Sequence, residues 1–140
     1  MKIVKAESVL VSIPFESGGI PPWSFGGSPR CNFDTLFVRL ETDTGIVGWG
    51  EAFSRNEDTA LKNLIDTRLL PLVLNRDPSA IAKIKFDLEF QLQNFGRAGP
   101  VIYGISAIDI ALWDIQGKAC GVPLVTLLGG AFADKVEVYA

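Results

Sequence analysis

The chain has 140 residues, about the length of one domain and too short for a complete eight-stranded α/β barrel. Hydrophobic residues make up 48% and charged residues 21%, which indicates a globular protein rather than a disordered segment. The net charge of -3, with basic residues scattered along the chain, argues against nucleic acid or an acidic membrane surface as a partner. The chain contains no histidine, which excludes imidazole-based triads and zinc sites and leaves carboxylate or lysine chemistry, or no chemistry.

Membrane insertion and secretion are not expected from the sequence. The most apolar stretch, 101–113, is interrupted by Asp109 and is too short to span a bilayer. Lys5 and Glu7 interrupt the N-terminal segment that a signal peptide would need to be apolar. We therefore expect a cytoplasmic protein.

The first third of the chain has the alternating pattern of β-strands. A first strand ends near residue 13, a second covers about 36–41, and a turn at 43–45 leads into a third at 46–51. Three consecutive strands of this kind predict an antiparallel meander. Gly48 and Gly50 fall on the same face of the third strand, which predicts that a helix packs closely there. In the first strand we expect one face to carry Val9, Val11 and Ile13 and the other Ser8 and Ser12.

From residue 54 onward the apolar period is helical. Capping-box spacing at 54–57 predicts a first helix that is disturbed near Pro71, and Asp77-Pro78 predicts the start of a second. A third helix is expected over about 101–120, and a short fourth over 123–128. Residues 135–140 resemble a strand without a neighbour, so we expect a further domain to begin there. The buried stripes are expected to be Leu61, Leu64, Ile65, Leu69 and Leu72 in the first helix, and Ile81, Ile84, Leu88, Leu92 and Phe95 in the second.

Charged residues in the helical region are better explained as structural or solvated than as catalytic. Lys83 and Lys85 lie two residues apart on a predicted helix, so their amines point to nearly opposite sides and cannot share a site. Asp109 and Asp114 diverge around the helix axis, which favours separate structural bonds. Lys118, four residues after Asp114, is its expected partner.

One segment invites a functional interpretation. The loop from Glu16 to Pro29 is rich in glycine and proline and carries Ile20, Trp23 and Phe25. Bulky apolar side chains flanked by glycines suit a flap that closes over a small ligand and excludes water. The alternative is that Trp23 and Phe25 fold back onto the domain, and the residues alone leave both open.

The third predicted helix and the segment after it carry a recognisable pattern. The run 109–118, DIALWDIQGK, followed by GVPL at 121–124 and LLGG at 127–130, resembles the signature of the mandelate racemase and muconate lactonizing enzyme family of the enolase superfamily. ETDTG at 41–45 leading into GWGE at 48–51 is also typical of the N-terminal domain of that family. Order and spacing agree along essentially the whole chain, apart from Gly104, where the family often has alanine.

The resemblance implies an α+β fold, with a three-stranded antiparallel meander followed by a bundle of three to four helices. Residues 1–133 would form the capping domain, with the sheet at about 1–53 and the helices at about 54–130. Residues 134–140 would begin the missing C-terminal (β/α)8 barrel. The barrel would supply the catalytic bases and the carboxylates that hold Mg²⁺, so this chain would contain neither and would be inactive alone.

The resemblance also assigns expected roles within this chain. The pocket lid would include Ile20, Trp23 and Phe25, and a second loop at 51–55 would contribute Glu51, Phe53 and Ser54. Tyr139 would lie near the barrel mouth. The intact protein would be a magnesium-dependent isomerase or lyase, a racemase, cycloisomerase or acid-sugar dehydratase, that removes the α-proton of a small carboxylate substrate. Family members are often homo-oligomers, and the alternative reading is a non-catalytic binding or assembly module.

Overall fold

A computed structural model describes residues 1–15, 32–54, 58–96 and 98–138. Its sheet contains three antiparallel strands in the order β1-β2-β3: β1 (Ile3–Pro14), β2 (Asn32–Thr42) and β3 (Val47–Ala52). This is the predicted meander. The turn after β2 is closed by the Thr42 N–H, which donates to the Ile46 carbonyl at 2.9 Å, and by the Thr42 hydroxyl. Together with the helices that follow the sheet along the chain, the meander gives the expected α+β fold.

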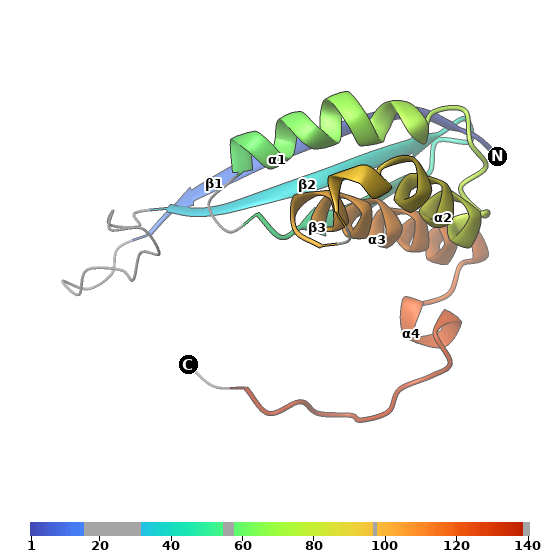
Figure 1. Cartoon of the computed structure of the whole chain (residues 1–140). Coiled ribbons are helices and arrows are strands. Elements are labelled where there is room, and N and C mark those ends of the chain that lie inside the picture. The colour runs from blue at the N-terminus through green and yellow to red at the C-terminus, as the bar shows by residue number, and fades with distance from the viewer. Residues whose placement is uncertain (16–31, 55–57, 97, 139–140) are drawn as a thin grey trace.

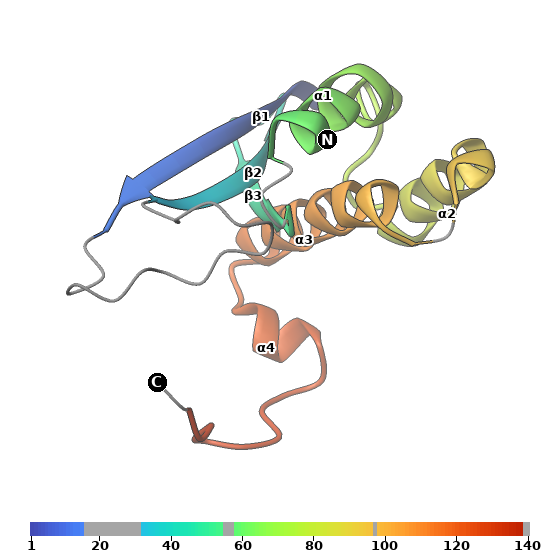
Figure 2. The ribbon, with the colours of Figure 1, turned by 60° about the vertical axis from the view of Figure 1, so that its left-hand side comes forward.

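The helices follow the sheet in sequence, and α1 and α3 cover one of its faces, while α2 packs on α3 and α4 lies away from the sheet (Figures 1 and 2). In Figure 1 α1 lies along β1, and in both views α3 runs beside β3. The face of the sheet that the helices cover is called the covered face, and the opposite face is called the open face. The helical segments are α1 (Asp58–Leu64), a π-helical turn (Ile65–Leu69), a 3-10 turn (Leu70–Leu72), α2 (Ile81–Gln91), a second 3-10 turn (Gln93–Phe95), α3 (Pro100–Cys120) and α4 (Leu124–Leu127).

The core lies between the sheet and the helices. Leu36, Val38 and Leu40 of β2 point to the covered face and are fully buried. Because side chains alternate along a strand, this face of β1 carries Ser8, and the opposite, open face carries Val9, Val11 and Ile13. The predicted grouping is confirmed, and the helices cover the serine side. The apolar partners from the helices include Leu61, Ile65, Leu69, Ile84, Leu88, Ile105, Ile108, Leu112 and Ile115.

The polar Ser8 is accommodated in this face by side chains of α1 and of the π-helical turn that follows it. Its hydroxyl donates to Asp66 Oδ1 at 2.6 Å, and Lys62 Nζ lies 2.9 Å from the same hydroxyl oxygen. Lys62 also pairs with Asp66 at 2.7 Å. The three groups satisfy one another, so a serine can be buried without a lost hydrogen bond.

The contact between β3 and α3 is unusually close because β3 lacks side chains on its covered face. A Cβ atom added to Gly50 would lie 1.9 Å from the Ala107 carbonyl oxygen, and one added to Gly48 would lie 2.2 Å from that of Ala111. These are overlaps with backbone, which cannot move aside cheaply. The prediction that a helix packs on the two glycines is confirmed.

Three helix predictions differ from the structure. The first helix widens into the π-helical turn before Pro71, which has no N–H to continue an α-helix, and Leu64 and Leu72 are only half-buried. The second helix begins at Ile81 because Asp77 accepts hydrogen bonds from the backbone and hydroxyl of Ser79, forming a turn instead of the first helical turn. Phe95, predicted to be buried, is 60% exposed, since α2 ends at Gln91 and the following 3-10 turn rotates the ring outward.

The end of the chain carries no described strand. Residues 135–138 lie outside helices and strands and are exposed. A strand needs a neighbour for its ladder, and none of the three described strands pairs with this segment. Across the described ranges, no helix is both long and apolar enough for a membrane crossing.

Candidate functional site

The two predicted loops are described unequally. Ile20, Trp23 and Phe25 lie outside the described residues, and so does Tyr139. The second loop is represented by Glu51, Phe53 and Ser54. The geometry of the proposed lid therefore rests on the end of β3 and on what surrounds it.

Phe53 is anchored on α3. It follows the last residue of β3, and its ring meets the ring of Tyr103 edge-on, with 5.4 Å between centroids and an interplanar angle of 87°. β3 and α3 run in opposite directions, since Gly48 lies against Ala111 and Gly50 against Ala107. The end of β3 is therefore brought to the first turns of α3, where Tyr103 stands. An edge-to-face pair of this kind stabilises the position of a half-exposed ring.

Tyr103, the partner of Phe53, is a residue that the sequence interpretation did not single out. The signal was nevertheless present: Tyr103 lies one helical turn before Ala107, and Ala107 is the residue that meets Gly50. Counting one turn back along α3 and forward along β3 places Tyr103 beside Phe53.

Glu51 does not lie on the same surface as the Phe53–Tyr103 pair. It is exposed and pairs with Phe37 across the β2–β3 ladder, on the face of the sheet that the helices leave open. Ser54 is half-buried directly after Phe53. Of the three described loop residues, the structure joins Phe53 to the helical side and sends the Glu51 side chain to the other.

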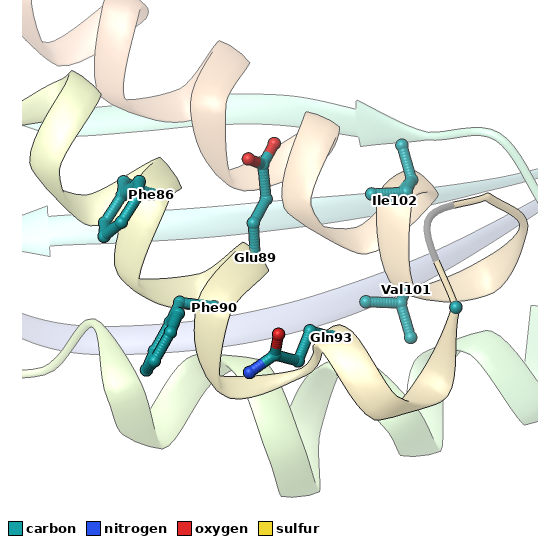
Figure 3. Close-up of a pocket in the computed structure, with 7 residues that line it drawn as sticks. Phe86, Glu89, Phe90, Gln93, Val101 and Ile102 are labelled. Atoms are coloured by element: carbon teal, nitrogen blue, oxygen red, sulfur yellow. The ribbon is translucent and has the colours of Figure 1, made fainter.

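A separate cavity of about 420 Å³ lies between α2 and the start of α3 (Figure 3). Glu89 on α2 and Gln93 in the following 3-10 turn face Val101 and Ile102 across it. Phe86 and Phe90 add a stacked aromatic pair, with centroids 6.1 Å apart. Of the described loop residues Glu51, Phe53 and Ser54, none lines this cavity, and its described walls offer one carboxylate and one amide among apolar groups.

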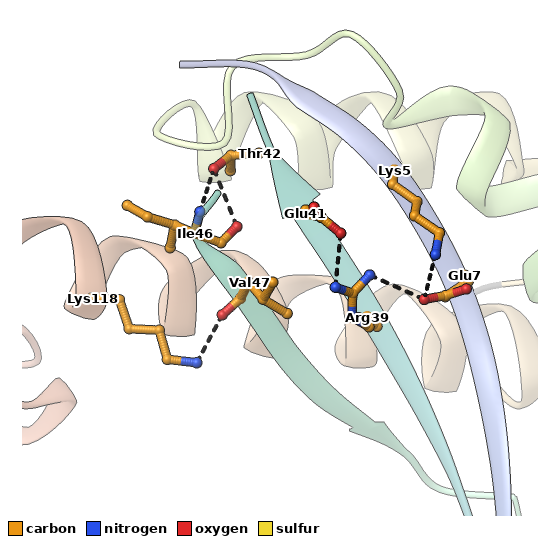
Figure 4. A network of polar contacts seen from close by, with 8 residues as sticks. All are labelled: Lys5, Glu7, Arg39, Glu41, Thr42, Ile46, Val47 and Lys118. Atoms are coloured by element: carbon orange, nitrogen blue, oxygen red, sulfur yellow. Dashed lines mark hydrogen bonds and ion pairs between the residues drawn. The ribbon is translucent and has the colours of Figure 1, made fainter. Parts of the chain in front are cut away.

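Four charged groups of the open sheet face pair with one another (Figure 4). Arg39 contacts Glu41 at 2.7 Å and Glu7 at 3.0 Å, and Lys5 contacts Glu7 at 3.2 Å. The hydrogen bond from Lys5, together with Arg39, lowers the pKa of Glu7, and Glu41 followed by Glu7 raises the pKa of Arg39. Both shifts favour the charged forms, so these groups are structural ion pairs and poor proton carriers at neutral pH.

The other charged clusters are structural as well. Lys118 Nζ lies 2.6 Å from Asp114, which confirms the predicted pair. Asp114 also accepts the Trp49 N–H at 2.9 Å, and Lys118 donates to the Val47 carbonyl at 2.8 Å. Lys83 and Lys85 both lie on α2 and are exposed, as expected. Lys83 pairs with Asp87, and this hydrogen bond, with that of Arg76, lowers the pKa of the Asp87 carboxyl.

Metal ligands do not gather in the part of the chain that the structure describes. No group of three or more His, Cys, Asp or Glu side chains there could hold an ion. Asp58 is buried at the start of α1 and its Oδ1 makes no hydrogen bond to a described residue, but it belongs to no such group. The described residues therefore do not fit a Mg²⁺ site. Instead, the close contact between β3 and α3 positions an aromatic pair at the end of β3.

Comparison with known proteins identifies this architecture. The N-terminal domain of mandelate racemase / muconate lactonizing enzyme matches residues 22–129. The D-galactonate dehydratase of Pectobacterium atrosepticum is 40% identical over 110 residues, which cover 75% of this chain and 27% of the relative. The chain thus spans about a quarter of the length of the curated relatives it matches.

Solved structures agree with the sequence relatives. A member of the enolase superfamily from Polaromonas sp. JS666 superposes with a TM-score of 0.79 at 31% identity, covering 94% of this chain and 34% of that one. A racemase from Streptomyces coelicolor A3(2) with bound magnesium superposes with a TM-score of 0.80 at 30% identity, covering 92% and 36%. Because the N-terminal domain of the family matches more than half of the chain, and the fold agrees, this chain belongs to the mandelate racemase / muconate lactonizing enzyme family.

Proposed function

We propose that this chain is the substrate-specificity and capping domain of a larger, metal-dependent enzyme that removes the α-proton of a carboxylate substrate. An acid-sugar dehydratase is the preferred reaction class. The observation that carries the proposal is the 40% identity to a D-galactonate dehydratase over most of this chain. The relatives are about three times as long as this chain, so the activity would belong to the whole protein, assembled with a C-terminal barrel and as a homo-oligomer.

The role of this chain in that enzyme would be to shape and dry the pocket. Phe53, held against Tyr103, would present an apolar surface at the end of β3, and the predicted lid residues Ile20, Trp23 and Phe25 would complete it. Mg²⁺ would be held by carboxylates outside this chain and would stabilise the enolate formed when the α-proton leaves. This chain would contribute no base and no metal ligand.

A domain replacement tests the capping role. The N-terminal domain of the Pectobacterium D-galactonate dehydratase is replaced by residues 1–133 of this chain, and dehydration of a panel of acid sugars is measured with Mg²⁺. We expect the hybrid to exceed the barrel alone, because a closed pocket excludes water and positions the substrate. A folded, Mg²⁺-binding hybrid with no more activity than the bare barrel would contradict the proposal. Turnover by the isolated 140-residue chain would do so too.

Phe53 offers a sharper test within the active hybrid. Phe53→Ala should lower kcat/KM by roughly tenfold, mainly through KM, because it removes an apolar wall and no reacting group. Phe95→Ala is the matched control, since that ring is similarly exposed but belongs to the 3-10 turn that follows α2. Equal losses in the two variants would mean that Phe53 does not border the pocket.

A further inference from the structure

The two edges of the sheet are covered to different extents. Backbone groups that point outward from an edge strand can pair with another chain unless something caps them. On β3, Asp114 accepts the Trp49 N–H and Lys118 donates to the Val47 carbonyl. Part of the outer edge of β3 is therefore occupied by α3.

On β1 only the first half of the edge is covered. The Ile3 N–H donates to the Arg76 carbonyl at 2.9 Å, and the Asn75 N–H donates to the Ile3 carbonyl at 2.8 Å. Farther along, Lys62 Nζ donates to the Ser8 carbonyl at 2.8 Å. The register shift between Ile3 and Lys5 explains why an odd and then an even residue face outward.

The second half of β1 is an open edge. In an antiparallel ladder, successive residues turn their backbone groups alternately toward and away from the neighbouring strand. Because the Ser8 carbonyl faces away from β2, the backbone groups of Leu10 and Ser12 do so as well. Within the described part of the chain, neither residue has a hydrogen-bond partner on that side. The stretch 9–13 contains no charge, no glycine and no proline to discourage pairing.

The open face beside this edge is apolar. Ile13 is 56% exposed and its register partner Phe33 is 60% exposed. Phe37 packs edge-on against Trp49 in the same face, with centroids 6.3 Å apart. Four charged residues of this face, Lys5, Glu7, Arg39 and Glu41, lie toward its other end (Figure 4). The fifth, Glu51, lies opposite Phe37 on β3, the strand farthest from the β1 edge.

We propose that β1 pairs antiparallel with β1 of a second copy of this chain, about a twofold axis at Val11, to make a continuous six-stranded sheet. Leu10 of each copy then faces Ser12 of the other, and the pair exchanges both N–H···O bonds on each side of the axis. On the open face, Val9 faces Ile13 of the second copy and Val11 faces its own counterpart. This extends the apolar surface across the axis.

The edge is complementary to itself in this register. The next outward pair joins Ser8 to Pro14 of the second copy. Pro14 has no N–H to donate, and the Ser8 carbonyl that would have accepted it is already held by Lys62. Shifting the axis to Leu10 would instead bring the Ser12 N–H against that occupied carbonyl. With no charge between residues 9 and 13, no like charges meet across the axis. These features favour a second copy as the occupant.

Association and amide exchange test the pairing in the 140-residue chain. Sedimentation equilibrium should show the mass doubling as concentration rises. The amides of Leu10 and Ser12 should exchange more slowly in the dimer than in dilute monomer. The amides of Val9 and Val11, which bond to β2, should be protected in both. A chain that stays monomeric up to millimolar concentration, or a dimer whose Leu10 and Ser12 amides exchange as in the monomer, would overturn the proposal.

Ser12→Pro and Ser12→Ala form a matched pair of variants. Proline removes the outward N–H without touching the β1–β2 ladder, so dimerisation should weaken by at least about tenfold, while alanine keeps the N–H and should leave it nearly unchanged. Leu10→Pro provides a second edge variant if the first perturbs folding, which far-UV circular dichroism reports. A folded Ser12→Pro variant that associates as tightly as the alanine variant would also overturn the proposal.

Discussion

The two sides of the sheet differ in how closely they are packed and in how their strand edges are covered. Between β3 and α3 the backbones approach so closely that no side chain fits, and helix side chains hold the outer edge of the strand. On the open face, and along the second half of β1, side chains are bulky and exposed. The comparison teaches that the stability of the packed side depends on single atoms, such as a Cβ at Gly50. The behaviour of the open side depends on the exposure and apolar character that several residues share.

The strongest way to break the packed side is to add one carbon to it. Gly50→Ala should lower the free energy of unfolding by about 3 kcal/mol or more, since its Cβ would overlap the Ala107 carbonyl and the helix must shift. Urea unfolding measures the change. Gly45→Ala is the control. A Cβ added at Gly45 would meet no atom within 4 Å, but the residue has a positive φ of 84°, so only backbone strain of about 1 kcal/mol is expected. Similar losses at both positions would disprove the steric explanation.

A smaller effect is expected where α3 caps the edge of β3. Asp114→Ala removes the acceptor of the Trp49 N–H and should cost about 1 kcal/mol, with faster amide exchange at Trp49. Asp114→Asn keeps an oxygen in place while it removes the charge that pairs with Lys118. It should therefore preserve most of the protection at Trp49. Unchanged exchange in the alanine variant would show that the bond contributes nothing to the edge.

Acid should lower only slightly the contribution of the open face to the free energy of unfolding. The pKa of Glu7 is lowered in the folded state by Lys5 and Arg39, so its contribution is present above its unfolded pKa and is lost as the pH falls through the lower folded value. The effect is small because exposed ion pairs are screened by water. Carboxyl NMR titration should report the lowered pKa of Glu7. In Glu7→Gln the fall of stability with acid should be shallower, and an identical acid profile would rule out this contribution.

The smallest change in stability is expected at the apolar end of the open face. Phe33→Thr should alter the free energy of unfolding by less than about 0.5 kcal/mol, because the ring is mostly exposed in the single chain. The same substitution should weaken association, since Phe33 lies beside Ile13 at the proposed interface. Thermal unfolding in dilute solution and sedimentation at high concentration separate the two effects. A large loss of stability in the monomer would show that this face is not open.

Much of the fold could be predicted because its signals are local. The strand alternation, the turn at 43–45 and the apolar period of 101–120 each require only neighbouring residues, and each is observed. The errors arose where a local rule met a competing interaction. Asp77 bonds to Ser79 and delays α2, and the end of α2 at Gln91 rotates Phe95 into solvent. Neither interaction leaves a mark in the apolar pattern from which the start of α2 and the burial of Phe95 were predicted.

The candidate site was less predictable because it joins distant residues. Phe53 was singled out, but its partner Tyr103 lies fifty residues farther along the chain and is visible only once β3 is laid antiparallel on α3. Glu51 was grouped with Phe53 by position in sequence, whereas strand alternation sends its side chain to the other face of the sheet. The lid residues Ile20, Trp23 and Phe25 remain predictions.

The sequence by itself determined the α+β class, the meander, the α3 pattern and the two glycines against which a helix must pack, because backbone conformation and apolar periodicity are properties of short segments. Only the tertiary structure decided that Asp114 serves Trp49 as well as Lys118, that Phe53 rests on Tyr103, and that one half of the β1 edge is covered while the other is open. Those outcomes depend on which distant atoms meet, and that is settled only when the helices have docked on the sheet.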